Sequence, residues 1–185
     1  MIKAVREAKQ HSSWLNPNDA YEQAIKRFIS RCLGAGEHRS ARFLQDFTAF
    51  ERRLRPAGLY NALSQTVLLL TSPGVPDLYQ GSELWQFSLV DPDNRRPVDF
   101  EYSRRAMAGI DERKGDDRIA FLKALLENLD DGLIKLFIVM EVLHFRNRHD
   151  ALFRDGQYLK ITGGGGRAGH LLAFARRNQD HFVVI

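Results

Sequence analysis

The chain has 185 residues, of which 44% are hydrophobic, 27% charged and 10% aromatic. This is the composition of a globular protein and excludes a fully disordered one, but the length is short for a complete (β/α)₈ barrel, which needs about 200–250 residues. The net charge of +4 comes from 27 basic and 23 acidic residues, and the basic pairs are interleaved with Asp and Glu. We therefore expect no nucleic-acid binding, because a phosphate-binding face needs a denser basic stripe.

Cysteine content and hydropathy bear on the compartment. Cys32 is the single cysteine, so no intramolecular disulfide can form, which fits a reducing compartment. The N-terminal residues lack the apolar core of a signal peptide. Aliphatic runs such as residues 67–70 are far shorter than the ~20 residues that span a bilayer. We predict a cytoplasmic protein with no membrane contact.

The first part of the chain carries a helical pattern. Asn16-Pro17 predicts a helix start, because Asn caps free N–H groups and Pro is tolerated in the first turn. Gly34 and Gly36 predict its end. Its apolar stripe, on which we expect the lone thiol to be buried and unreactive, consists of Tyr21, Ile25, Phe28, Ile29 and Cys32.

A second helix is predicted from about Ser40 to a stop near Pro56 and Gly58. We expect its apolar face to pack in the core; that face comprises Phe43, Phe47, Phe50 and Leu54. Residues 59–70 are apolar nearly all round, which predicts a buried helix. After a Pro-Gly turn, Val75–Tyr79 predicts a short buried strand that opens into a polar loop.

The rest of the chain alternates polar, helical and strand-like segments. Residues 86–118 are polar and contain two prolines, which predicts a long irregular loop. Apolar residues at helical spacing predict helices at Ile119–Leu129 and Leu133–Asn147. Strand-like composition then appears three times, with a glycine-rich turn after the first, at Gln157–Ile161, His170–Arg176 and His181–Ile185. The expected fold class is α+β, mainly helical.

Motifs of several enzyme classes are absent from the sequence. There is no phosphate-binding loop, no nucleophile elbow and no Cys-x-x-Cys pair. His144 and His149 are five residues apart and do not share a helix face, so they do not form a pair of metal ligands. We expect no metal site and no cofactor.

The polar residues that stand out follow the predicted buried strand. The carboxyl ends of strands are where barrel and open α/β folds bind ligands. Amides and guanidinium groups hydrogen-bond vicinal hydroxyls, and a Trp ring stacks on the apolar face of a sugar. A solvated loop held by its own Asp–Arg pairs explains the same residues equally well. The candidate ligand contacts are Gln80, Glu83, Trp85, Asp91, Asn94, Arg95 and Arg96.

A resemblance to a known family rests on this region. Residues 74–85 are Gly-Val-Pro-Asp-Leu-Tyr-Gln-Gly-Ser-Glu-Leu-Trp, and residues 91–99 are Asp-Pro-Asp-Asn-Arg-Arg-Pro-Val-Asp. The first motif is typical of the α-amylase group (glycoside hydrolase family 13), and the second is more specific to its maltooligosyl trehalose synthases. The stretches at 6–17, 131–136 and 170–177 also resemble these synthases, in the same order. The chain is thus similar to the C-terminal portion of that family.

Three positions depart from the family pattern. Ser12 stands where Thr is expected and Ser82 where Thr is common, and both keep a hydroxyl group. Gln86 stands where Asp is usual, which leaves the role of that loop position open.

The resemblance implies more about the fold. Val75–Tyr79 would be the last strand of a (β/α)₈ barrel, and Leu133–Asn147 would be its closing helix. Residues 1–154 would form the C-terminal part of the catalytic barrel with a helical insertion, and residues 155–185 the truncated beginning of a C-terminal β-domain. By matching position, His11 and Trp14 would approach a sugar site lined by the 80–99 stretch.

The resemblance also implies an activity. Members of the family are isomerases of trehalose biosynthesis, which convert the reducing-end α-1,4 linkage of a maltooligosaccharide into an α,α-1,1 linkage by intramolecular glucosyl transfer. They act by retention, with an Asp nucleophile, a Glu that is acid and then base, and a second Asp that stabilises the transition state.

The motifs of those three carboxylates precede the matching region in the family and are not found in this sequence. We therefore assign no catalytic residue and expect the chain to be inactive alone. A maltooligosaccharide is the expected substrate, and the missing N-terminal portion of the barrel is the expected partner. The alternative is a non-catalytic helical module that binds carbohydrate or another protein.

Overall fold

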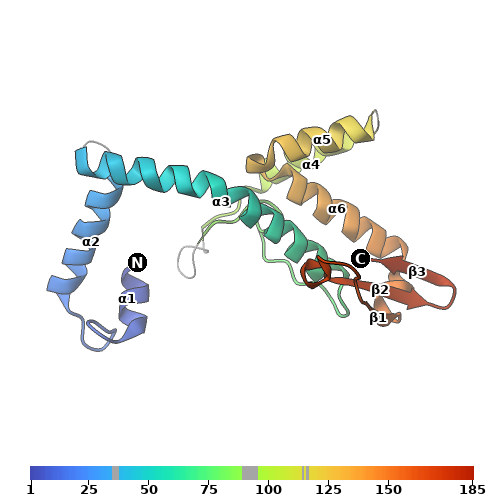
Figure 1. The fold of residues 1–185 in the computed structure, drawn as a ribbon, viewed down its shortest axis with the longest axis horizontal. Helices are drawn as coiled ribbons and strands as arrows, with labels where there is room; N and C mark the ends of the chain where they lie inside the picture. The colour runs from blue at the N-terminus through green and yellow to red at the C-terminus, as the bar shows by residue number, and fades with distance from the viewer. Residues whose placement is uncertain (35–37, 89–95, 114, 116) are drawn as a thin grey trace. The chain divides into compact units, whose positions relative to one another are not determined.

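The computed structural model describes residues 1–34, 38–88, 96–113, 115 and 117–185. The described chain is mainly helical and carries a small antiparallel sheet near its C-terminus (Figure 1). It divides into two compact units, here the N-terminal unit, Met1–Pro56, and the C-terminal unit, Ala57–Ile185. No described helix is long and apolar enough to span a membrane.

The N-terminal unit contains α1 (Ile2–Ala8), which the sequence did not predict, α2 (Asp19–Leu33) and the first part of α3. The helix α2 begins after Asn18, whose side chain accepts a hydrogen bond from the Tyr21 N–H at 3.1 Å. The predicted start at Asn16-Pro17 was therefore early, because the cap is the next asparagine. The predicted end at Gly34 is confirmed, whereas Gly36 lies outside the described residues.

The helix α3 (His38–Thr71) continues through Pro56, where the sequence predicted a stop. A proline inside a helix removes one N–H donor and crowds the preceding turn, but its ring does not prevent the following residues from staying helical. Glu51 and Arg55 stabilise the turn before it with two side-chain hydrogen bonds of 2.7 Å. The two predicted helices are one helix, because neither Pro56 nor Gly58 breaks it.

The burial predicted for the apolar stripes of α2 and α3 is wrong. Cys32 is only partly buried, and Phe28 is 69% exposed. The face of α3 that was expected in the core is exposed at every position, with 45% for Phe43, 52% for Phe47, 58% for Phe50 and 53% for Leu54. Helical spacing identified the face correctly, but it could not show whether the described chain supplies anything to cover it.

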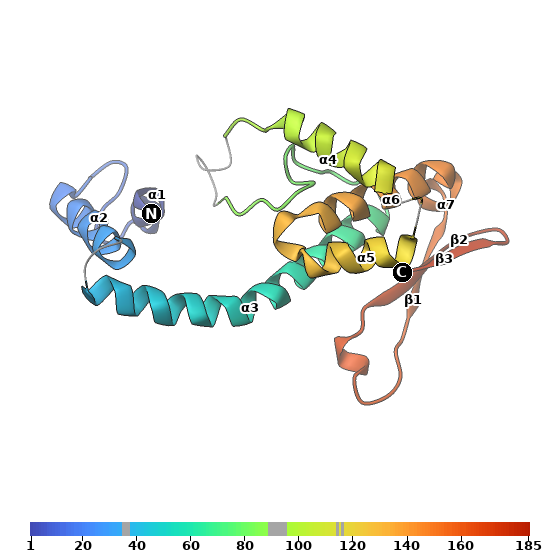
Figure 2. The same ribbon diagram turned by 90° about the horizontal axis from the view of Figure 1, so that it is seen from above.

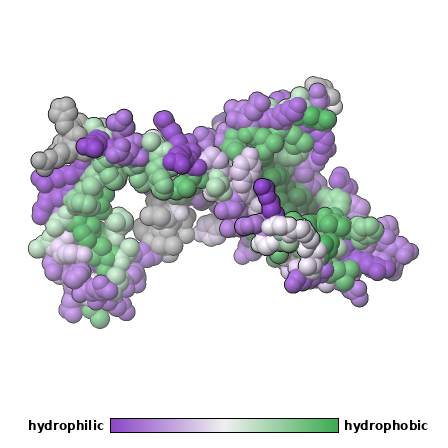
Figure 3. Space-filling view, in the orientation of Figure 1, coloured by the Kyte–Doolittle hydropathy of each residue, from purple (hydrophilic) through white to green (hydrophobic). Residues whose placement is uncertain are grey.

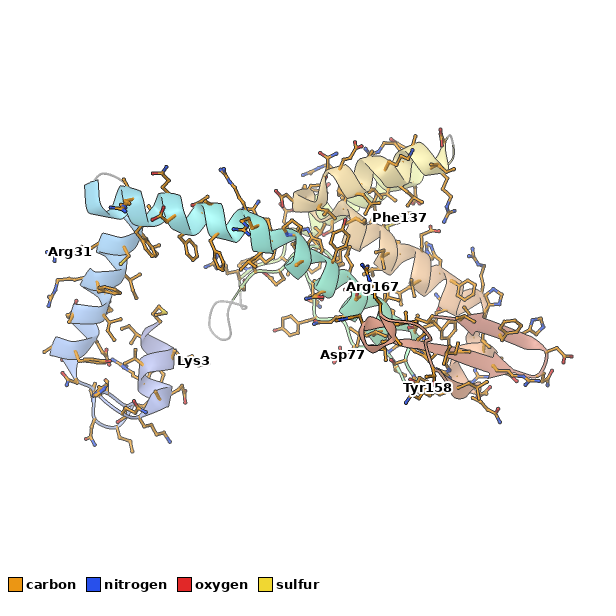
Figure 4. The ribbon with its side chains drawn as sticks, viewed as in Figure 1. Lys3, Arg31, Asp77, Phe137, Tyr158 and Arg167 are labelled. Carbon is orange, nitrogen blue, oxygen red and sulfur yellow. The ribbon has the colours of Figure 1, made fainter. Side chains whose placement is uncertain are left out.

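The C-terminal unit is built around α6 (Leu133–Arg148), with α4 (Phe100–Arg113) and α5 (Arg118–Glu127) beside it (Figure 2). Phe137 points into this helical core (Figure 4) and meets Phe121 edge to face at 5.6 Å between ring centroids. The core cluster consists of Leu63, Ile110, Phe121, Leu125, Ile134, Leu136, Phe137 and Met140.

The helices α5 and α6 confirm the two predicted at 119–129 and 133–147. The prediction of a long loop over 86–118 is wrong for Phe100–Arg113, which forms α4. The Asp99 carboxylate accepts the Tyr102 N–H at 2.8 Å and so caps this helix. The charged surface of α4 hid it in the sequence, because only Ser103 and Ile110 of its residues are buried.

The second half of α3 belongs to the C-terminal unit and is buried on one face only. Leu59, Leu63 and Leu70 are buried, whereas Tyr60 and Leu69 are 50% and 43% exposed. The buried strand predicted at Val75–Tyr79 is not formed; Val75 is 94% and Tyr79 is 66% exposed. A strand needs a neighbour for its N–H and C=O groups, and none of the described strands pairs with this segment.

The sheet has the order β1-β2-β3 and is antiparallel throughout, with β1 at Gln157–Ile161, β2 at Ala173–Asn178 and β3 at His181–Val184. The three predicted strands are confirmed. The second starts later than predicted, because Ala168–His170 forms a short 3₁₀ helix, η3. The domain boundary predicted between residues 154 and 155 stays a prediction.

A buried arginine attaches the sheet to α7 (Asp150–Arg154). Arg176 of β2 is 1% exposed, and its Nη2 donates to the carbonyl oxygens of Phe153 at 2.7 Å and Gly156 at 2.8 Å. The Phe153 ring centroid lies 5.9 Å from the Arg176 guanidinium and 5.1 Å from that of Arg146. Burial, and then the charge of Arg146, lower the pKa of Arg176.

The fully buried Ile110 provides a test of the core. Ile110→Ala removes a side chain that is 0% exposed, so we expect it to lower the free energy of unfolding by about 2–5 kcal/mol. Ile119→Ala is the matched control, because Ile119 is 68% exposed and its truncation should change stability by no more than about 0.5 kcal/mol. Urea unfolding followed by helical circular dichroism measures both; equal losses would contradict this assignment of the core.

Candidate functional site

The first group of site residues lies in the N-terminal unit, around a buried carboxylate that the sequence did not single out. Glu22 of α2 is 3% exposed. Its two oxygens accept hydrogen bonds from Arg6 Nε at 2.7 Å and Arg6 Nη2 at 2.8 Å, and Oε1 also accepts from Ser12 Oγ at 2.6 Å. Ser12 Oγ in turn accepts the Asn18 N–H at 3.0 Å. This network joins α1 and the 9–18 loop to α2.

The network shifts the pKa of Glu22. Hydrogen bonds from Arg6 and then from Ser12 lower its pKa from 4.5 to about 2, against an opposing effect of desolvation. The pKa of Arg6 is raised, mainly by its hydrogen bonds to Glu22. The carboxylate therefore stays ionised and holds both partners in place.

Two predicted site residues, His11 and Trp14, lie on the loop that this network holds. The Arg6 guanidinium lies 5.0 Å from the Trp14 ring centroid, and Trp14 Nε1 donates to Glu7 Oε1 at 3.0 Å. The His11 ring contacts that of Tyr21, with 5.0 Å between centroids. Trp14 is nevertheless 53% exposed, so its ring is oriented and still accessible.

The second group lies in the C-terminal unit, on the segment 80–88. Its first turn packs tightly, because Gly81 has φ +85° and a Cβ there would lie 3.1 Å from Val98 Cγ2. The turn is closed by the Ser82 N–H, which donates to the Tyr79 carbonyl at 2.9 Å. Val98 thus packs against the beginning of the segment, and the positive φ together with this close contact favours glycine at position 81.

Glu83 projects from this segment toward α4 and α6. It accepts a hydrogen bond from Ser103 Oγ at 3.3 Å. Lys135 of α6 donates to the Leu84 carbonyl at 3.2 Å; burial lowers its pKa, and the charge of Glu83 partly offsets that effect. The sequence did not single out Ser103 or Lys135, because neither lies near Glu83 along the chain.

Trp85 is fixed by the start of α6. Its Nε1 donates to the Leu129 carbonyl at 2.5 Å, and Lys135 Nζ lies 5.6 Å from its ring centroid. Gly132 has φ +76°, and a Cβ there would lie 3.1 Å from Trp85 Cδ1 and from its backbone nitrogen. The ring of Phe87 stacks against it at 6.4 Å. The indole is therefore largely engaged by the protein itself.

The structure describes only some of the other predicted site residues. Asp91, Asn94 and Arg95 lie outside the described residues. Gln80 and Arg96 are exposed. Within the C-terminal unit the structure brings Glu83 and Trp85 together through Lys135, whereas the approach of His11 and Trp14 to these residues stays a prediction. No group of three His, Cys, Asp or Glu side chains in the described ranges could hold a metal ion.

The C-terminal unit also has an open cleft of about 320 Å³ between the start of α7 and the turn from β2 to β3. It contains none of the predicted site residues. Its single acidic side chain is Asp150, which pairs with Arg154 at 2.5 Å. The cleft is lined by Arg148, His149, Asp150, Ala151, Leu152, Asn178, Gln179 and His181.

Comparison with known proteins shows what the chain as a whole is similar to. Over 183 residues, 99% of this chain, the sequence is 37% identical to a protein of Mycobacterium tuberculosis (strain CDC 1551 / Oshkosh) that is named as a maltooligosyl trehalose synthase. The same identity holds for the relative from strain H37Rv. No family model matches the chain.

Solved structures agree with the sequence match. A crystal structure of a maltooligosyl trehalose synthase superimposes on 100% of this chain, with a TM-score of 0.76 and 30% identity. The TM-score is 0.74 for a Sulfolobus tokodaii protein of the same name, and 0.72 for the Arthrobacter ramosus enzyme, which covers 95% of the chain. The chain is homologous to the C-terminal region of maltooligosyl trehalose synthases. It spans about a fifth of the length of these synthases, 20% of the mycobacterial protein and 23% of the first crystal structure.

The buried Glu22 predicts an acid dependence of the N-terminal unit. Because the folded pKa lies below the usual 4.5, the contribution of Glu22 to stability is complete above that value and is lost as the pH falls toward 2. Glu22→Gln should lower stability at neutral pH and flatten this acid dependence. Unfolding of the N-terminal unit in urea can be measured from the indole N–H signal of Trp14 in ¹⁵N NMR, because the chain has only two tryptophans.

The control for this measurement is Glu127→Gln, which removes an exposed carboxylate and should leave the acid dependence unchanged. If Glu22→Gln and the wild type lose stability in parallel across the acid range, the network does not hold the unit together.

Proposed function

We propose that this chain provides the substrate-binding wall of a maltooligosyl trehalose synthase, an isomerase of trehalose biosynthesis in the cytoplasm. Such an enzyme moves the terminal glucose of a maltooligosaccharide from an α-1,4 to an α,α-1,1 linkage. The observation that carries the proposal is that similarity in sequence and in fold to these synthases runs through the whole chain, at 37% identity and a TM-score of 0.76.

The proposed sugar contacts are Gln80, Glu83, Trp85, Asp91, Asn94, Arg95, Arg96, His11 and Trp14. Among the described ones, Glu83 offers a carboxylate that is held by Ser103. Trp14 offers an accessible ring whose orientation is set by Glu7 and Arg6. Trp85 differs, because its N–H is already donated to Leu129. We assign Trp85 mainly to positioning the 80–88 segment against α6.

The catalytic acids are proposed to lie outside this chain. Glycosyl transfer with retention needs two carboxyl groups about 5–5.5 Å apart. The cleft of the C-terminal unit supplies one carboxylate, Asp150, which is engaged by Arg154. Glu83 is oriented by the hydrogen bond from Ser103, which suits an acceptor for sugar hydroxyls. We therefore propose that the described residues contribute to substrate binding and not to cleavage.

The exposed segment Val75–Tyr79 supports the proposal that a barrel is completed by other polypeptide. Two of its apolar side chains are exposed, 94% for Val75 and 66% for Tyr79, where a barrel strand would bury its apolar residues. If neighbouring strands were supplied, the segment would become the last barrel strand, and residues 155–185 would open the C-terminal β-domain. The residues that follow, 80–88, would then lie at the carboxyl end of that strand, where barrels bind substrates.

Incubation with maltohexaose tests whether the chain needs catalytic acids from other polypeptide. The chain alone should form no non-reducing product, because the motifs of the family's catalytic carboxylates are not found in its sequence. A chimera, in which this chain replaces the matched region of the mycobacterial relative, should form that product. Turnover by the chain alone would contradict the proposal, and a folded but inactive chimera would favour the alternative of a non-catalytic carbohydrate-binding or interaction module.

Glu83→Gln in the same chimera tests the substrate-binding wall. Loss of a charged hydrogen-bond acceptor should raise KM for maltohexaose about tenfold, since such bonds contribute about 1.5–3 kcal/mol. Glu127→Gln, at an exposed carboxylate of α5, is the matched control and should leave KM unchanged. An unchanged KM in both variants would remove Glu83 from the proposed site.

A further inference from the structure

Lys135 carries a positive charge at an unfavourable place in the C-terminal unit. It is the one charged residue at positions 133–140, the first half of α6, and its neighbours Ile134 and Leu136 are 6% and 2% exposed. Figure 3 shows mostly hydrophobic residues where α6 is visible beside α5. Burial lowers the pKa of Lys135, and the first turn of a helix disfavours a cation because the helix dipole is positive there. The ammonium group therefore needs partners that offset both effects.

Every partner that the described residues give this ammonium group belongs to the 80–88 segment. Its Nζ donates to the Leu84 carbonyl at 3.2 Å and lies 5.6 Å from the centroid of the Trp85 ring. The charge that raises its pKa, against the effect of burial, is that of Glu83. Residues 83, 84 and 85 thus interact with one cation, which ties their backbone to α6.

The Glu83 carboxylate is restrained from two helices. From α4, Ser103 Oγ donates to its Oε1 at 3.3 Å, which is longer than the roughly 2.5–3.0 Å typical of such bonds. From α6, Lys135 holds the carbonyl of the residue that follows Glu83. Since the contact from Ser103 is long, the direction of the carboxylate depends on how firmly Lys135 holds the backbone next to it.

We propose that Lys135 is a positioning residue of the proposed substrate-binding wall, whose ammonium group fixes the backbone at residues 83–85 and so aims the Glu83 carboxylate at the sugar. This proposal deepens the proposed function and rests on it. A neutral side chain of similar length would pack on α6 without the cost of burying a charge. Packing alone therefore does not explain a lysine at this position.

Hydrogen exchange in the chain alone tests the positioning without any need for activity. Lys135→Met keeps the length of the side chain and removes its charge. The Trp85 indole N–H, which is donated to the Leu129 carbonyl, should then exchange with deuterium about tenfold faster, because the segment has lost a hydrogen bond from a charged group. Lys135→Arg should restore slow exchange, since a guanidinium also donates to a carbonyl and stacks on a ring.

The matched control for this measurement is Lys123→Met, which removes an exposed charge from α5 and should leave the exchange of the indole N–H unchanged. Unchanged exchange in Lys135→Met, or faster exchange that Lys135→Arg does not reverse, would overturn the proposal.

Kinetics in the chimera test the consequence for substrate. Lys135→Met should raise KM for maltohexaose about tenfold and leave kcat unchanged. The double variant Lys135→Met/Glu83→Gln should have the KM of Glu83→Gln alone, because Lys135 acts through Glu83. Increases in KM that multiply in the double variant would overturn the proposal. A wild-type chimera without activity, together with faster exchange in Lys135→Met, would count against the proposed function and support the positioning.

Discussion

The contact between Trp85 and the start of α6 determines where the 80–88 segment lies. Gly132 leaves room for the indole, the Leu129 carbonyl accepts its N–H, and Lys135 reaches back to the Leu84 carbonyl. Since α6 is also the centre of the helical core, the position of this segment is tied to the most buried part of the unit. Glu83, a proposed sugar contact, is therefore held by the core and not by its own loop.

In the N-terminal unit, a charged network holds the loop that carries the proposed sugar contacts. Its segments are joined by one ionised carboxylate, Glu22, which satisfies both Arg6 and Ser12. A buried carboxylate is stable only when charged partners and hydroxyl donors surround it. This network fixes the loop that carries His11 and Trp14 and leaves the Trp14 ring accessible, so each unit holds its proposed sugar contacts by internal hydrogen bonds.

Patterns along the sequence predicted the elements whose partners are local. The helices α5 and α6 and the three strands were found because apolar spacing and composition identify them directly. The helix end predicted near Pro56 was wrong, because the helix continues through this proline. The burial of the apolar face of α3 and the strand at Val75–Tyr79 were predicted wrongly for a shared reason. An apolar pattern shows that a face can be covered, but the covering surface need not be in the same chain.

Of the candidate site, the sequence located the segment but not its supports. Glu83 and Trp85 were chosen as candidates by residue type and position and stay predictions, whereas Ser103, Lys135 and Glu22 become visible only when distant elements are brought together. The most direct test of the substrate-binding wall is a ¹⁵N NMR titration of the chain with maltohexaose. The account predicts saturable shifts of the amides of residues 80–88, with no product formed; shifts confined to the cleft around His149 and His181, or none at all, would contradict it.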